Sequence, residues 1–236
     1  MPTTYPLTWD SAADRKYETG LDHGALYVYN TATNKYGADE AYFNVWNGLT
    51  SVSESPDGAD ITELYADNMK YLSLQAAENF KATVEAYTYP KQFNQCDGVK
   101  ELDGGVYVNL QSRATFGLYY RTKAGDANGT EWYKHHFIYG CKVTPSDKSY
   151  ETVNDSPSAI TFSWEIDSTP VTDTISATGF EAGTYTLSMI TIDENELTSA
   201  QKSSLNSGTL YTKLFGTSST PGELPLPNDL FTALGQ

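Results

Sequence analysis

The sequence predicts a mainly β fold: a β-sandwich or barrel with a small flanking helix, an extended N-terminal arm and a Pro-rich C-terminal tail. Aromatic residues make up 13% of the chain and include 18 Tyr, a composition typical of half-buried strands joined by turns. Several segments alternate apolar and polar residues with period two, whereas long amphipathic helices are scarce. The 236 residues can bury a sizeable core as one domain.

The chain divides into three parts in this prediction. Residues 1–22 contain Pro2 and Pro6 and show no sustained periodicity, so we expect an extended arm. Residues 23–192 carry the strand-like segments and form the β core. Residues 193–236 form a C-terminal helix and an extended tail.

The first half of the core is expected to hold five strands and a short helix. Phe80, Ala82, Val84 and Ala86 alternate with polar residues, so one side of that strand faces the core. A long loop or protruding hairpin begins near the turn at residues 55–58. The expected strands cover residues 25–30, 42–53, 61–65, 71–75 and 80–87, and the short helix lies within residues 90–98.

The second half offers the strongest local pattern, a hairpin of two strands at residues 114–123 and 131–143. The intervening sequence AGDANGT supplies the Asp, Asn and Gly residues that such a turn requires. Residues 160–166 then alternate cleanly and predict a strand with one buried face. Residues 184–192 predict one more strand.

The last forty residues predict a helix followed by an extended tail. Thr198 and Gln201 have the spacing of a capping box, and Gly208 is placed to end a helix of about two turns. Three prolines then impose an extended path before a final turn from Asn228, at Pro221, Pro225 and Pro227. We expect this tail to lie on a surface.

The charge argues against tight nucleic-acid binding. The formal net charge is -15, with 30 acidic and 15 basic residues, whereas proteins bind phosphate backbones through Lys and Arg. Cys96 and Cys141 stand in unrelated contexts and are expected to be free thiols. The N-terminal sequence has no apolar run of the signal-peptide type and no segment has the length of a membrane span, so we expect synthesis and assembly in a cytoplasm.

The histidines do not predict a metal or acid–base site. His135 and His136 are adjacent on an expected strand, so their side chains point to opposite faces and cannot bind one metal together. His23 stands alone near the arm. We expect structural roles for all three, and no metal or cofactor.

Other polar clusters are better explained by local structure. Residues 193–196, with the sequence DENE, precede the capping box and suit a helix N-terminus rather than a calcium loop. Asp126 and Asn128 are ordinary turn residues. No nucleophile motif or phosphate-binding glycine loop is present, so we expect no hydrolase or transferase activity. The sequence does not exclude a pair of glycosidase carboxylates, because two such residues can be distant in the sequence and still meet in the fold.

Several segments together resemble the major tail tube protein of bacteriophages with long, flexible, non-contractile tails. They are the tyrosine-rich first strand, TELYADNMKYLSL at residues 62–74, the hairpin, NDSPSAITFSWEIDSTPV at residues 154–171 and the LPLP tail at residues 224–227. The block at residues 154–171 is the most specific of them. The resemblance covers most of the chain.

The resemblance implies a tail-tube-type β-sandwich whose six copies form a ring, with rings stacking on a tape-measure protein into a hollow tube. It implies a virion location, contacts with tail terminator and baseplate or tail-tip proteins, and transient, non-specific passage of double-stranded DNA. It implies no enzymatic activity, no cofactor and no membrane anchoring. The excess of acidic residues suits a lumen that repels a sliding duplex.

Two alternatives remain from the sequence. A carbohydrate-binding β-sandwich would use exposed aromatic side chains as stacking platforms, and Trp46, Trp132 and Trp164 could serve in it, although Trp164 is better explained as core. A tail terminator or head-tail joining protein would share the acidic, β-rich character and end as one ring. The length and the Pro-rich C-terminus favour the tube subunit.

Overall fold

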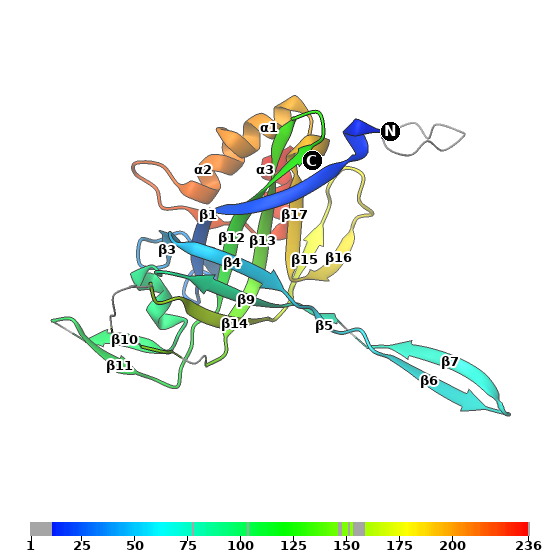
Figure 1. Cartoon of the computed structure of the whole chain (residues 1–236), viewed down its shortest axis with the longest axis horizontal. Helices are drawn as coiled ribbons and strands as arrows, with labels where there is room; N and C mark the ends of the chain where they lie inside the picture. Colours follow the sequence, from blue (N-terminus) through cyan, green and yellow to red (C-terminus); the bar gives the residue numbers. More distant parts are fainter. Residues whose placement is uncertain are drawn as a thin grey trace.

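The computed structural model describes residues 11–76, 78–102, 104–145, 148–150, 152 and 159–235, and it is mainly β (Figure 1). The expected mainly β, sandwich-type fold is confirmed. Residues 154–158, which open the block at residues 154–171 that resembles tail tube proteins, lie outside the described residues, as do residues 1–10 of the expected arm.

A ten-stranded antiparallel sheet forms the framework of the protein. The strand order is β18-β2-β1-β12-β13-β14-β9-β4, with β3 paired to β1 and β17 paired to β13. The sheet contains β1 (Lys16–Asn30), β2 (Lys35–Gly37), β3 (Phe43–Val45), β4 (Leu49–Glu54), β9 (Lys81–Ala86), β12 (Phe116–Asp126), β13 (Glu131–Val143), β14 (Phe162–Ser168), β17 (Met189–Asp193) and β18 (Glu223–Leu224).

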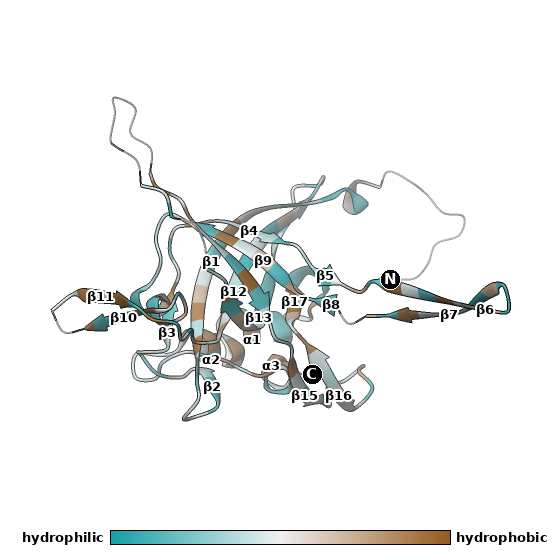
Figure 2. Ribbon diagram, turned by 90° about the horizontal axis from the view of Figure 1, so that it is seen from below, coloured by the Kyte–Doolittle hydropathy of each residue, from teal (hydrophilic) through white to brown (hydrophobic). Residues whose placement is uncertain are grey.

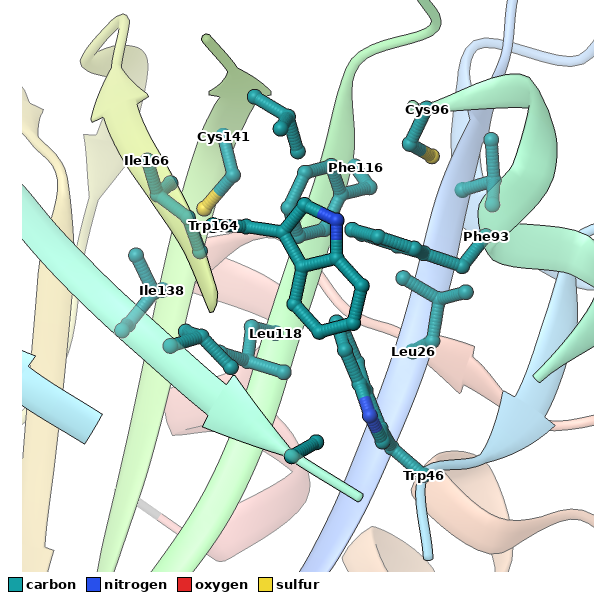
Figure 3. Packing of buried hydrophobic residues seen from close by; sticks show 14 of the residues in the cluster. Leu26, Trp46, Phe93, Cys96, Phe116, Leu118, Ile138, Cys141, Trp164 and Ile166 are labelled. Atoms are coloured by element: carbon teal, nitrogen blue, oxygen red, sulfur yellow. The ribbon is translucent and has the colours of Figure 1, made fainter. Parts of the chain in front are cut away.

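The sheet folds over on itself, so that β4, β9 and β14 cross over β1, β12 and β13 (Figure 1). The first hydrophobic core lies between these two layers. Trp164 is its centre: the ring centroid lies 5.0 Å from that of Phe93 and 5.7 Å from that of Trp46 (Figure 3). Aromatic pairs at such separations add to the stability that burial provides.

A second core lies on the other face of β1, β12 and β13, where three C-terminal helices cover the sheet. Tyr27 is fully buried there, and its hydroxyl donates to the carbonyl of Leu214 at 2.9 Å. Because both faces of the central strands are covered, β13 is buried along most of its length. The helices are α1 (Ser199–Asn206), α2 (Thr209–Phe215) and α3 (Pro227–Leu234), and three short 3-10 turns are η1 (Ala12–Asp14), η2 (Lys91–Gln95) and η3 (Glu194–Glu196).

Four two-stranded ribbons leave the main sheet. Each pairs only with itself in the described part of the chain. Figure 1 shows that the ribbon of β6 and β7 extends far from the body of the protein. The ribbons are β5 (Asp57–Gly58) with β8 (Glu78–Asn79), β6 (Ile61–Ala66) with β7 (Met69–Gln75), β10 (Val99–Leu102) with β11 (Val106–Asn109), and β15 (Val171–Ile175) with β16 (Gly183–Leu187).

Several predicted elements are confirmed. Strand β9 buries Ala82, Val84 and Ala86 on one face, as the alternation predicts. The hairpin of β12 and β13 and the protruding hairpin of β6 and β7 are both present. Helix α1 begins after Thr198, which forms the expected capping box with Gln201. The helix expected within residues 90–98 is present as the 3-10 turn η2.

The expected arm is wrong from Lys16 onward. Residues 16–22 belong to β1 and pair with β12, beginning with Lys16 opposite Asp126. The side chains of this part of β1 are largely exposed, so no alternation reveals the strand. Gly20 and His23 have positive φ at two irregularities in the register, and these distort the strand further.

The C-terminal segment is not an extended surface tail. It contains helices α2 and α3 and the short strand β18. Leu224, Leu230 and Leu234 are all buried in the second core. The Pro-rich path therefore carries apolar side chains into the core, and Pro227 begins α3, where a missing N–H costs nothing.

Two expected strands are each broken into two. Residues 42–53 form β3 and β4, with Trp46 buried between them and Gly48 at positive φ. Residues 184–192 form β16 and β17 in different sheets, and the break falls at Ser188, whose carbonyl accepts from the Tyr139 N–H. Ribbon β10–β11 and strand β15 were not predicted.

Candidate assembly surface

The hairpin of β6 and β7 is the most distinctive surface feature. It exposes large apolar side chains on both strands, and Figure 2 shows hydrophobic positions along both. An isolated two-stranded hairpin is only marginally stable in water. The exposed apolar side chains of this hairpin are Ile61, Leu64, Tyr65, Met69, Tyr71 and Leu74.

The turn of this hairpin follows from two residues. Asp67 and Asn68 have φ of 52° and 61°, respectively. A two-residue turn with both φ values positive matches the right-handed twist of the flanking strands, and Asn and Asp tolerate that conformation better than other non-glycine residues. The sequence ADNM therefore fixes the register of the ribbon.

That register gives the hairpin two chemically different faces. Leu64 pairs with Leu72 and Thr62 with Leu74, while Ala66 pairs with Met69. Directly paired residues share a face of a ribbon, and alternate residues along a strand share it too. We call the face that carries these six residues the apolar face: Thr62, Leu64, Ala66, Met69, Leu72 and Leu74.

The opposite face carries a polar network. Lys70 forms an ion pair with Glu63, and the hydroxyl of Tyr65 donates to the same carboxylate at 2.6 Å. These two hydrogen bonds, that from Lys70 first, lower the pKa of Glu63 below its ordinary value. An irregularity in register at Tyr71 keeps Lys70 opposite Tyr65. Ile61 and Tyr65 lie on this face as well, so the two faces differ in charge: only the apolar face has no charged side chain, and it is the one suited to a partner surface.

The three histidines lie in separate surroundings, and two of them, His135 and His136, are buried in hydrogen-bonded positions. His135 lies on the helix side of β13, with Nε2 2.9 Å from Glu194 Oε1 and Nδ1 2.8 Å from the Tyr119 hydroxyl. His136 lies on the other side, stacked on Tyr120 with ring centroids 4.6 Å apart. The two rings thus face opposite ways, as predicted, and His23 is exposed beside Asp22.

Glu194 is a buried member of the DENE segment that the sequence explains only in part. Asp193 caps η3 by accepting from the Asn195 N–H at 2.9 Å, which confirms a capping role for the segment. Burial opposes the ionisation of Glu194, but hydrogen bonds from His135 and Asn206 outweigh it, so the pKa of Glu194 lies below its ordinary value. No sequence signal pairs Glu194 with His135, which is 59 residues away.

Metal-binding and nucleophilic groups can be located in the described part of the chain. There, no cluster of three or more His, Cys, Asp or Glu side chains could hold a metal ion. Cys96 and Cys141 are both free, as predicted, and both are buried in the first core. Burial raises the pKa of each thiol well above its ordinary value, which makes neither a ready nucleophile.

The three tryptophans named as carbohydrate platforms are buried. Trp46 and Trp164 are in the first core, with exposed fractions of 1% and 0%. Trp132 is 8% exposed, and the ammonium group of Lys16 lies 5.8 Å from its ring centroid. None of them presents an open ring face to a sugar, so the residues on which that alternative depended are unsuitable.

Comparisons with known proteins add no family. The chain matches no protein-family model, and no curated protein matches it. No helix in the described ranges is both long enough and apolar enough to cross a membrane. The class that fold and surface define is therefore a mainly β, sandwich-type protein with a projecting amphipathic hairpin.

Proposed function

We propose that the protein is a structural virion protein, the subunit of the tail tube of a long-tailed, non-contractile bacteriophage. In this proposal six copies form a ring and the rings stack into a hollow tube around a tape-measure protein, with DNA passing through the lumen. Tail terminator and tail-tip proteins bind its ends. The protein is made in the host cytoplasm and has no catalytic role.

The observation that carries the proposal is the apolar face of the β6–β7 hairpin. Met69 and Leu74 are 64% and 54% exposed on a ribbon that pairs with no other described strand. A repeating assembly offers such a ribbon a permanent partner, since copies of the chain supply the surface that covers it. The sandwich with helices on one outer face also supports the proposal, because the tail tube family that the sequence resembles implies a β-sandwich.

Negative-stain microscopy of concentrated protein tests the proposal. We expect hollow tubes of uniform diameter. Single rings that do not stack would favour a terminator or joining protein, and compact monomers that give a glycan-array signal would favour a carbohydrate-binding module. Either result contradicts the tube proposal.

A matched pair of variants tests the role of the hairpin. Leu74→Asp places a charge on the apolar face, and Ser73→Asp places the same charge one residue away on the polar face. We expect tubes from Ser73→Asp and none from Leu74→Asp, with both subunits folded by circular dichroism. Equal tube formation by the two variants would show that the apolar face plays no part in assembly.

A further inference from the structure

A groove at the far end of the molecule complements the apolar face of the hairpin. It lies between η2 and the β10–β11 ribbon and has a volume of about 600 Å³. Ala41, Val99, Leu110 and Ala114 contribute apolar side chains to its lining, and Leu110 is 46% exposed. Volumes of this size accept several side chains.

Two side chains that line the groove form hydrogen bonds to a neighbouring segment. The side chain of Gln92 donates to the carbonyl of Glu40 at 2.9 Å, and that of Gln95 donates to the carbonyl of Ala41 at 3.1 Å. These bonds fix η2 against the segment before β3. A groove that exists before binding loses little conformational freedom when a partner enters it.

The hairpin and the groove lie at opposite ends of the long axis of the protein. Figures 1 and 2 both place β6 and β7 at one end and β10 and β11 at the other. The six residues of β6 span about 20 Å at the usual rise of a strand, so the hairpin reaches well outside its own subunit. It cannot fill the groove of its own chain, but it can fill that of the next one.

The charges at the two ends are also complementary. Asp67, at the tip of the hairpin, is exposed, and so is Lys100 at the groove. Neither forms an ion pair in the part of the chain that the structure describes, whereas Lys91 at the groove is paired with Glu101. A tip that enters the groove would bring the carboxylate of Asp67 toward the ammonium group of Lys100.

From these features we infer that the apolar face of the β6–β7 hairpin docks into the η2 and β10–β11 groove of a second copy of this chain. The contact is head-to-tail, because two different surfaces of the same molecule meet, and such contacts repeat from copy to copy. Leu64 and Leu74 would lie against Leu110 and Val99 of the next copy. The inference deepens the proposed function and rests on it, since it takes self-assembly as given.

Disulfide crosslinking of a double variant tests the contact directly. Leu64→Cys with Leu110→Cys places one thiol on the apolar face and one in the groove, while the natural thiols of Cys96 and Cys141 are buried. After mild oxidation we expect a ladder of covalent oligomers on a non-reducing gel. The matched control, Tyr65→Cys with Leu110→Cys, carries its thiol on the opposite face and should lose the ladder.

Mixing the single variants tests whether the contact is head-to-tail. Leu64→Cys mixed with Leu110→Cys should give covalent dimers and nothing larger, because each copy then holds one thiol of the pair. Each variant alone should stay monomeric on the gel. Covalent dimers of Leu64→Cys alone would show that two hairpins meet each other, which overturns the inference.

The results separate this inference from the proposed function. Tubes in the microscope without a ladder from the Leu64 and Leu110 pair would overturn the docking contact and leave the tube proposal standing. A ladder without tubes would support the contact and contradict the tube. Absence of both would overturn both.

Discussion

His135 and Glu194 form a buried pair that ties strand β13 to the turn before helix α1, with 2.9 Å between Nε2 and Oε1. An ionised carboxylate only accepts hydrogen bonds, so the Nε2–H of His135 is the donor. The second oxygen of Glu194 accepts from the Tyr133 N–H at 3.4 Å. The pair thereby fixes the position at which the C-terminal helices cross the sheet.

Removing His135 should destabilise the fold. His135→Ala leaves the carboxylate of Glu194 buried without its main partner, which typically costs about 1–3 kcal/mol of unfolding free energy. Glu194→Gln keeps an acceptor for the Nε2–H and should cost less. Urea unfolding at neutral pH measures both. Equal stability of His135→Ala and the natural protein would show that the pair does not hold the helices in place.

The environment of His136 leads to a prediction about acid. Its ring stacks on Tyr120, and its Nε2 lies 2.9 Å from Thr122 Oγ1. Burial lowers the pKa of His136 below 6.5, although the charges of Glu54 and Glu18 oppose this. Lys134 and His135 lower that pKa further by repulsion.

Stability should therefore fall as the pH drops through 6.5. In that range the unfolded chain binds a proton at this histidine and the folded chain does not, so unfolding is favoured. His136→Gln should flatten the decline between about pH 7 and about pH 5. Thermal unfolding across this range is the measurement. Glu194, whose folded pKa is also lowered, should add a separate loss only below 4.5. An unchanged slope in His136→Gln would contradict the assignment.

The β6–β7 hairpin should be dispensable for folding and required for assembly. The Ala76 N–H donates to the Asp60 carbonyl at 3.0 Å, so the ends of the hairpin lie close enough for a short glycine linker to replace residues 61–75. Neither hydrophobic core includes a residue of the hairpin. We expect a nearly unchanged melting temperature and no tubes. Tubes of normal length would show that the hairpin has no assembly role.

Truncating the N-terminus should destabilise the subunit, whereas removing an unpaired arm would leave its stability unchanged. Deleting residues 1–19 removes Lys16 to Thr19 from the ladder with β12, and with them the ion pair between Glu18 and Lys134. Shortening residues 53–59 would likewise lose Glu54, which accepts from the Tyr120 hydroxyl at 2.8 Å. Both changes should lower the melting temperature by several degrees. A folded subunit of unchanged stability would restore the arm interpretation.

The sequence predicts an element well where a local pattern and the tertiary environment agree. Strand β9 buries alternate residues on one face, and Thr198 caps α1 through neighbours only three residues away. The start of β1 lacks such a local pattern because its side chains are exposed. Its strand conformation comes from pairing with β12, about a hundred residues later. Helix α2 was missed because it follows Gly208, which predicts a helix end.

The candidate site was predicted only in outline. The protruding hairpin and its turn follow from local sequence, but its amphipathic character depends on the irregularity at Tyr71, which turns residues 69 and 70 relative to the alternating pattern. The groove by η2 combines segments that are about fifty residues apart, such as Glu40 with Gln92. Sequence periodicity does not indicate which distant segments contact each other.

The ion pairs of the subunit lead to a prediction about salt. At least nine of the 15 Lys and Arg residues form ion pairs within their own chain, and Lys70, Lys81 and Arg121 are paired with Glu63, Asp57 and Asp22. These nine are Lys35, Lys70, Lys81, Lys91, Arg121, Lys123, Lys134, Lys148 and Lys213. Most of the cations are thus paired within their own chain, and acidic residues outnumber basic ones by 30 to 15, so repulsion between subunits dominates.

Moderate salt should therefore promote polymerisation of the purified subunit. At a net charge of -15, copies repel one another, and this repulsion is screened beyond about 8–10 Å at physiological ionic strength. The cohesion comes from burial of apolar surface such as that of the hairpin, which salt does not weaken. Light scattering across a sodium chloride series at neutral pH, with microscopy to separate tubes from aggregate, measures the dependence. Lys100→Gln provides the control, because it removes the groove cation that forms no ion pair in the described part of the chain and should reduce assembly most at low salt. Tube formation that falls steadily as salt rises would contradict the argument and identify ion pairs between subunits as the main attraction.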